Sequence, residues 1–261
     1  MREEANLPFA GKTSLVVGGT TGLGFEIAKK LVALRSRVVI MGRQKEKGEA
    51  AAASLGDQVQ FIECDIGDSR RVDDAFDALA ERFELHFAVN NAGVTGLHAP
   101  IRGMDPCDWD RLIQVNCSGP FYCLRREIEL IRHGAGGAIV NVSSCAGRLA
   151  IPNQAAYVSS KAALNILTQV AAIENATDHD GGFAVRVNAV APGPILGGMN
   201  TVERLAANPE STKRKIAVTA MKRFARPEEV VDSIIYLLGP GAAYITGAVL
   251  DVDGGYHAGK F

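Results

Sequence analysis

Near the N-terminus the sequence reads Leu15-Val16-Val17-Gly18-Gly19-Thr20-Thr21-Gly22-Leu23-Gly24. Branched aliphatic residues here meet three glycines with the spacing GxxxGxG. The aliphatic run predicts a buried strand and the residues after Gly22 predict a helix, so the glycines form the turn between them. A helix N-terminus has unpaired N–H groups that attract anions, and glycine places no Cβ in their way. The turn therefore predicts a phosphate site, although a glycine-rich turn can also be only a tight loop.

Short β-branched runs alternate with longer helical stretches along the rest of the chain, without a linker. The predicted strands span 14–17, 37–41, 59–62, 87–90, 138–142, 185–190 and 248–252. The predicted helices span about 22–35, 43–55, 69–84, 105–133, 155–177 and 227–238. Such alternation folds as βαβ units around a parallel sheet. We expect an α/β fold of the Rossmann type, with a doubly wound, seven-stranded parallel sheet, helices on both faces and one domain over 1–261.

The composition is that of an ordinary globular protein, with 47% hydrophobic and 22% charged residues among 261. Lys+Arg number 28 against 29 Asp+Glu, without a basic patch, which disfavours a nucleic-acid partner. No apolar run approaches a membrane span, and residues 1–12 lack an apolar signal core, so we expect a cytoplasmic protein without a membrane partner. Five scattered cysteines without CxxC, and histidines without ligand spacing, predict reduced thiols and no metal.

Tyr157 and Lys161 are the candidate catalytic pair, because residues four apart in a helical stretch share one face. A free tyrosine titrates near about 10, and a neighbouring ammonium lowers that pKa toward neutrality. Ser144 ends a predicted strand, at the sheet edge where ligands bind in such folds, and its hydroxyl can bind a substrate oxygen. The pattern YxxxK alone is common by chance, so the surrounding motifs carry the assignment.

From Lys12 to Tyr256 the chain resembles the short-chain dehydrogenase/reductases, in their compact branch. The matching motifs are Gly18, Gly22 and Gly24; Asn90-Asn91-Ala92-Gly93; Asn116 and Gly119; Ser144, Tyr157 and Lys161; Pro192-Gly193; and Ile245-Thr246-Gly247 with residues 251–255. Two positions depart from the family pattern. Val17 replaces a common threonine, and Gly197 falls where a threonine usually touches the nicotinamide carboxamide. The departures put the local cofactor contacts there in doubt.

The resemblance implies a role for each catalytic residue. Tyr157 is the general acid/base, Lys161 lowers its pKa and binds the nicotinamide ribose, Ser144 polarises the carbonyl, and Asn116 holds a water of the proton relay. Asp65 caps the adenine. The expected cofactor-binding residues are Gly18, Thr20, Thr21, Gly22, Leu23, Gly24, Arg43, Asp65, Ile66, Asn91, Ala92, Gly93, Tyr157, Lys161, Pro192, Gly193 and Ile195.

The expected reaction is hydride transfer between a nicotinamide and a small-molecule carbonyl or secondary alcohol, as an NADPH-dependent ketoreductase. NADP(H) is preferred because Gly42 stands where NAD-binding relatives carry an acid, and Arg43 can pair with a 2′-phosphate. NAD(H) stays possible, since Arg43 can also be a solvated residue opening a helix. The alternatives are an NAD-dependent alcohol dehydrogenase, a non-catalytic dinucleotide sensor, and a scaffold protein that assembles through its long helices.

Two further expectations concern a mobile segment and a subunit interface. Residues 194–223 carry no interpretable motif, and we expect them to form a substrate lid hinged near Gly197 and Gly198. The stretches 105–133 and 155–177 have apolar or small residues on most faces, which predicts either deep burial in one chain or contact with a second subunit. The resemblance favours the latter, as a homotetramer or homodimer.

Overall fold

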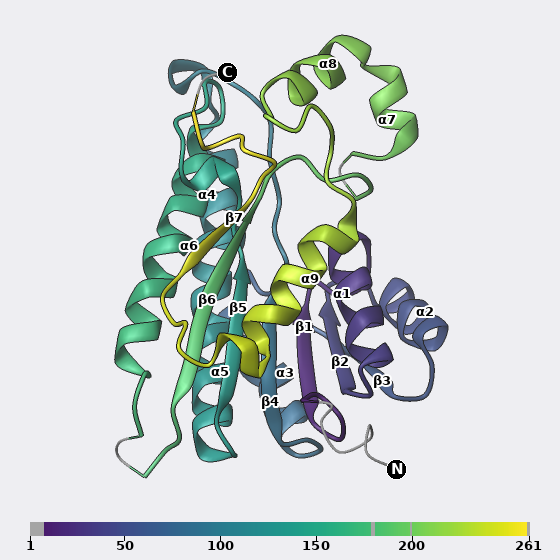
Figure 1. The fold of residues 1–261 in the computed structure, drawn as a ribbon, viewed down its shortest axis with the longest axis vertical. Coiled ribbons are helices and arrows are strands. Elements are labelled where there is room, and N and C mark those ends of the chain that lie inside the picture. The colour runs from purple at the N-terminus through teal and green to yellow at the C-terminus, as the bar shows by residue number, and fades with distance from the viewer. Residues whose placement is uncertain (1–7, 179–180, 199, 260–261) are drawn as a thin grey trace.

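Seven parallel strands form one sheet in the computed structural model, which describes residues 8–178, 181–198 and 200–259 (Figure 1). The strands are β1 (Thr13–Val17), β2 (Arg37–Gly42), β3 (Val59–Glu63), β4 (Leu85–Asn90), β5 (Gly137–Val142), β6 (Val185–Pro192) and β7 (Val249–Val252). Their order across the sheet is β3-β2-β1-β4-β5-β6-β7. All seven predicted strands and their parallel arrangement are confirmed. Met199 of the expected lid lies outside the described residues.

Helices cover both faces of the sheet, as predicted (Figure 1). One face carries α1 (Gly22–Ala33), α2 (Lys45–Leu55) and α9 (Pro227–Leu238), and the other carries α3 (Ser69–Ala80), α5 (Gly119–His133) and α6 (Ala155–Glu174). Successive side chains of a strand point to opposite faces, so Val16 packs into the first core and Leu15 and Val17 into the second. Strands covered on both faces explain the near-continuous aliphatic runs of the sequence.

Two helical regions differ from the prediction. The stretch 105–133 is interrupted, because α4 (Pro106–Ile113) and α5 are joined by a π-helical turn, η3 (Gln114–Ser118). Apolar periodicity continues through such a turn, so the pattern could not locate it. Within 194–223 the chain forms two short helices, α7 (Val202–Ala207) and α8 (Pro209–Ala217), where none was predicted. No helix of the described residues is long and apolar enough to cross a membrane.

The carboxyl ends of the strands carry the functional region. The strand order reverses at β1, which lies between β2 and β4, and crevices at such points bind ligands in doubly wound sheets. The segment 194–223 lies beyond these ends, with α7 and α8 at the top of Figure 1. Two backbone hydrogen bonds close its base, from Ala225 N to Pro194 O and from Leu196 N to Ala225 O, both 2.9 Å. These two hydrogen bonds join the start of the segment to Ala225, and we call this connection the neck.

Candidate active site

The glycine turn connects β1 to α1, where the sequence placed it. Gly18 and Gly22 have φ of 77° and 56°, a backbone conformation that side chains disfavour. Thr21, the N-cap of α1, makes no side-chain hydrogen bond to the first helical turn, which also contains no acid. The N–H groups and the positive end of the helix dipole are therefore available to an anion.

Gly24 packs closely against the glycine turn, and its expected contact with the cofactor stays a prediction. A Cβ at Gly24 would lie 2.0 Å from the carbonyl oxygen of Gly18 and 2.6 Å from Asn91 Nδ2. Gly24 also lines neither cavity of the site. Its glycine is required because α1 lies directly against the turn.

The segment after β4 is hydrogen-bonded to the glycine turn. Asn91 Nδ2 donates to Gly18 O at 2.9 Å, and the backbone N–H groups of Asn91 and Ala92 both donate to Val17 O at 3.0 Å. Val17 itself is buried, so the residue that departs from the family pattern contributes its carbonyl here and no side-chain polar contact. The Asn-Asn-Ala-Gly motif and the glycine turn are thus one hydrogen-bonded unit.

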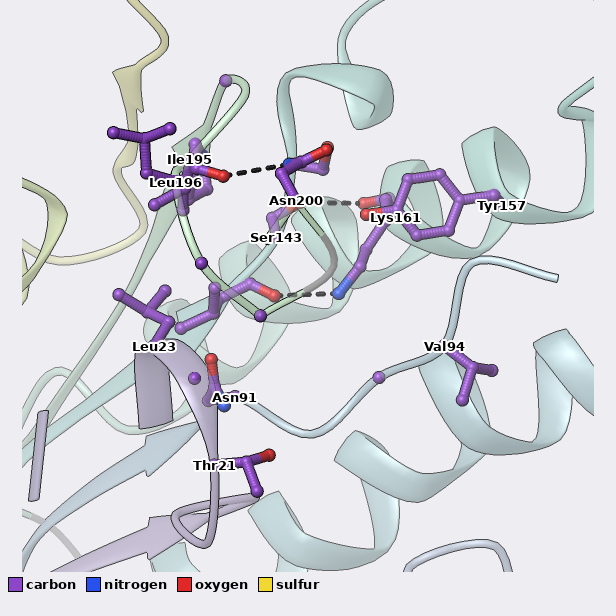
Figure 2. A pocket seen from close by; sticks show the side chains of 18 residues that line it. Thr21, Leu23, Asn91, Val94, Ser143, Tyr157, Lys161, Ile195, Leu196 and Asn200 are labelled. Atoms are coloured by element: carbon purple, nitrogen blue, oxygen red, sulfur yellow. Dashed lines mark hydrogen bonds between the residues drawn. The ribbon is translucent and has the colours of Figure 1, made fainter. Parts of the chain in front are cut away.

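Two adjoining cavities follow this unit, of about 400 Å³ and about 310 Å³. Four lining residues belong to both: Thr21, Asn91, Gly93 and Val94. The larger cavity is lined on one side by Thr21 and Leu23 and on the other by Tyr157 and Lys161 (Figure 2). The smaller one extends to Arg43 and Asp65. Together they form an elongated groove, which we call the cofactor groove. Every expected cofactor-binding residue except Gly24 lines it.

The smaller cavity also contains a basic residue that the sequence analysis missed. Lys47, in the first turn of α2, lines it together with Arg43. Both side chains are exposed, and neither makes a hydrogen bond or ion pair with another residue of the described chain. The spacing of four residues could have indicated Lys47, since Arg43 begins the predicted helix 43–55 and residues four apart in a helix share a face. Asp65 lines the opposite part of the cavity, and its Oδ1 accepts a hydrogen bond from Gly67 N at 3.0 Å.

Tyr157 and Lys161 lie on one face of α6 and line the larger cavity (Figure 2). Ser144 lines the same cavity. Lys161 Nζ donates to Val142 O at 2.9 Å. Ser144 begins the short helix η4 (Cys145–Gly147), and its Oγ accepts from Ala146 N at 3.1 Å. A Cβ at Gly147 would lie 2.8 Å from the Lys161 backbone, so this residue must be small for η4 to pack against α6. Three of the four expected catalytic side chains therefore meet on a closely packed support.

Burial sets the electrostatics of this corner. It lowers the pKa of Lys161 to about 8 and raises the pKa of Tyr157, an effect that a hydrogen bond with Ser144 opposes. The lowering of the Tyr157 pKa that the Lys161 ammonium is expected to cause stays a prediction. The phenol is protonated at neutral pH and the lysine is mostly charged.

Asn116 lies at the same end but is fully buried in the π-helical turn. Its Oδ1 accepts from Val94 N at 2.8 Å and its Nδ2 donates to Val94 O at 2.7 Å. A Cβ at Gly93 would lie 3.2 Å from Asn116 Oδ1 and 3.5 Å from Lys161 Nζ. The side chain thus fixes the groove wall at Val94 beside Lys161. The expected role in a water relay is not tested by these contacts.

The start of the 194–223 segment closes the larger cavity. Gly197 and Asn200 exchange two backbone hydrogen bonds, of 3.0 Å and 2.9 Å, which form a tight turn. Asn200 Nδ2 donates to Ile195 O and its Oδ1 accepts from Lys215 Nζ, at 2.9 Å and 2.7 Å. A Cβ at Gly22 would lie 3.4 Å from Gly198 Cα. The segment therefore touches the glycine turn across the groove.

Comparisons with known proteins agree with this geometry. The model of a family described as enoyl-(acyl carrier protein) reductase matches residues 17–257. The chain is 33% identical to a 3beta-hydroxysteroid dehydrogenase of Mediterraneibacter gnavus, over 95% of each chain. It is 34% identical to an NADP-dependent (R)-specific alcohol dehydrogenase of Lentilactobacillus kefiri, over 95% of this chain and 97% of the relative. A solved short-chain type dehydrogenase/reductase from Mycobacterium ulcerans superposes with a TM-score of 0.88 at 30% identity, covering 97% of this chain and 92% of that one.

Proposed function

Because the chain belongs to the short-chain dehydrogenase/reductase family of oxidoreductases, we propose that it is an NADPH-dependent ketoreductase acting on a small-molecule carbonyl. The proposal rests above all on one observation. Tyr157, Lys161 and Ser144 meet at one end of the cofactor groove, whose middle is the glycine turn at the N-terminus of α1. An acid, a cation and a hydroxyl at the end of an anion-binding groove suit hydride chemistry on a carbonyl.

The groove fits a dinucleotide in shape and in donors. Its two cavities meet at Thr21 and Asn91, beside the α1 N-terminus, where a pyrophosphate would bind. Arg43, Lys47, Asp65 and Ile66 would hold the adenosine end, and Tyr157 and Lys161 with Pro192, Gly193 and Ile195 the nicotinamide end. A bound nicotinamide dinucleotide supplies the hydride.

The chain's own residues would handle the proton. Ser144 Oγ binds the substrate oxygen and orients it, and Tyr157 donates its phenolic proton to that oxygen as the alkoxide develops. The pKa of Tyr157 is raised by burial, so the phenol is protonated at neutral pH and has a proton to donate. The Lys161 ammonium stabilises the tyrosinate that remains. Asn116 keeps the Val94 wall and Gly93 in place beside these groups.

The preference for NADP(H) is supported by charge at the adenosine end. Arg43 and Lys47 present two cations to the smaller cavity, and Gly42 leaves the end of β2 without an acid. A guanidinium pairs with phosphate through two parallel N–H groups, and the lysine adds a point charge. Each charge-assisted hydrogen bond contributes about 1.5 to 3 kcal/mol, roughly tenfold to a hundredfold in affinity.

A cofactor assay with a carbonyl panel tests the proposal. The protein is incubated with NADPH or NADH and a series of ketones, and with NADP or NAD and secondary alcohols, while the nicotinamide absorbance is followed. We expect consumption of NADPH with at least one ketone and a higher kcat/KM for NADPH than for NADH at fixed substrate. Consumption of neither cofactor would favour a dinucleotide sensor or scaffold. A ratio that favours NADH would show that Arg43 and Lys47 do not bind a phosphate productively.

We also propose that the protein assembles through α5 and α6 as a homodimer or homotetramer. Ile166, Val170 and Ile173 of α6 and Phe121 of α5 are exposed in the single chain, with Ile173 at 80% exposure. Deep burial within one chain therefore does not account for these apolar side chains, whereas a second subunit would cover them. Sedimentation at micromolar concentration tests this, because a monomer would contradict it.

A further inference from the structure

A buried acid lies under the cofactor groove and takes no part in the chemistry above. Glu127 of α5 is fully buried, and its Oε2 accepts a hydrogen bond from Asn90 Nδ2 at 2.8 Å. The same Asn90 nitrogen donates to Asn141 Oδ1 at 3.0 Å, and Asn141 Nδ2 donates to Thr168 Oγ1 at 2.8 Å. The chain of hydrogen bonds thus connects α5, β4, β5 and α6 inside an apolar core.

No cation compensates this carboxyl group. Among the residues that the structure describes, none with a positive charge forms an ion pair or hydrogen bond with Glu127, and burial raises its pKa to about 8 against the opposing bond from Asn90. The titratable groups that face this part of the core are the thiols of Cys123 on α5 and Cys64 after β3, whose pKa values burial also raises. All three groups are therefore predominantly neutral at pH 7.

The hydrogen-bonded partner of Glu127 directly precedes a residue that lines the groove. Asn90 is the last residue of β4, and the next residue, Asn91, donates to Gly18 O. The contact between the two segments is tight, since a Cβ at Gly18 would lie 2.7 Å from Ala92 Cα. A small displacement of Asn90 would therefore also displace the glycine turn.

We propose that Glu127, in its protonated form, is a positioning residue of the cofactor groove: it holds Asn90, and through Asn90 it fixes residues 91–93 against the glycine turn. The inference rests on the proposed dinucleotide binding. The two buried oxygens that lack partners, Glu127 Oε1 and Asn90 Oδ1, fit a role beyond packing, because an apolar side chain would stabilise the core without leaving polar atoms unpaired. An ionised Glu127 would bring an uncompensated charge into the core beside Asn90.

Three variants test the role by the fluorescence-measured Kd for NADPH and NADH at pH 6.5. Glu127→Leu removes the acceptor for Asn90 and should weaken binding of both dinucleotides about tenfold. Glu127→Gln keeps an acceptor without a charge and should restore the wild-type Kd. Ile131→Val, one turn further along the buried side of α5, is the matched control; it should lower the melting temperature and leave Kd unchanged.

A pH series separates positioning from folding and needs no apolar variant to fold. If only the protonated form is competent, the ratio of wild-type Kd to Glu127→Gln Kd should rise from about one at pH 6.5 to about tenfold at pH 9. Any titration of Lys161 is common to both proteins and cancels. An infrared carbonyl band of a protonated carboxyl should be present in the wild type and lost in Glu127→Gln.

The outcomes are distinct. A wild type that binds neither dinucleotide overturns the proposed function, and the inference falls with it. A wild type that binds, with a Kd unchanged in Glu127→Leu or equally weakened in Ile131→Val, overturns the inference alone. A Kd ratio that stays constant between pH 6.5 and 9 overturns it as well, even if Glu127→Leu does not fold.

Discussion

The larger cavity lies between the 194–223 segment and the rest of the cofactor groove, and these two walls differ in how deeply their residues are buried. In the groove's reactive corner Lys161 and Asn116 are nearly or fully inaccessible, and Tyr157 and Ser144 are half-buried, with Tyr157 on a 20-residue helix. Thr219 is the one buried residue among those described in 194–223, and the two helices there are short. A rigid framework can hold reacting groups to a fraction of an ångström, whereas a loosely packed segment can move to admit ligands. This difference suits the buried corner to holding the reacting groups and the 194–223 segment to admitting ligands.

Removing the catalytic proton should give the largest effect. In Tyr157→Phe the proton donor is lost while the ring still fills its place, so we expect kcat to fall about 10²- to 10⁴-fold with dinucleotide Kd within a few-fold of wild type. Lys161→Ala should lower kcat and raise the dinucleotide Kd, because the Lys161 ammonium acts on both the tyrosine and the cofactor. Turnover retained in Tyr157→Phe would show that the rigid corner is not where the proton comes from.

Changes at the adenosine end should alter cofactor choice and little else. Arg43→Ala should remove most of the NADPH preference, a tenfold to hundredfold change in the ratio of kcat/KM for NADPH and NADH, with Lys47→Gln giving a smaller loss. Gly42→Asp should reverse the preference, provided that Thr20 rotates, since a Cβ there would lie 2.8 Å from Thr20 Cγ2. Lys45→Gln, whose lysine instead pairs with Glu49, is the control and should leave the ratio unchanged.

The pH profile should report the buried lysine. The pKa of Lys161 is lowered to about 8, so its positive charge is present below that pH and lost above it. We expect kcat/KM for NADPH, which reports the free enzyme, to fall up to about tenfold per pH unit above pH 8. When the profile is measured in Glu127→Gln, the titration of Glu127 does not contribute to this fall. A flat profile to pH 10 in that variant would contradict the burial of a titrating cation at this corner.

The smallest effect is expected in the 194–223 segment. Asn200→Ala removes the side-chain bonds to Ile195 and Lys215, and should raise the substrate KM a few-fold while the dinucleotide Kd is unchanged. Hydrogen exchange should slow across 194–223 when dinucleotide and a substrate analogue bind together, since we propose that it acts as a lid. Identical exchange with and without ligands would show that the segment is as fixed as the groove.

The same contrast explains what the sequence could and could not predict. The strands and the glycine turn follow from local chemistry, because a buried parallel strand must be aliphatic and Gly18 must adopt a positive φ. The helices α7 and α8 were missed because they are short and mostly solvated, although Thr201 caps α7 and Pro209 begins α8. The spacing from Arg43 could have indicated Lys47, whereas the bond between Glu127 and Asn90 depends on tertiary placement, which periodicity does not encode.

The contact between Gly22 and Gly198 has a kinetic consequence. A dinucleotide along the groove would pass the point where these two glycines meet, so we expect Gly197 and Gly198 to move outward for each entry and each departure. The neck at Pro194 and Ala225 keeps that motion local. We therefore expect a compulsory sequence of events, with the nucleotide arriving first and leaving last. Departure of the oxidised nucleotide, rather than hydride transfer, would then limit steady-state turnover of good substrates, visible as a pre-steady-state burst.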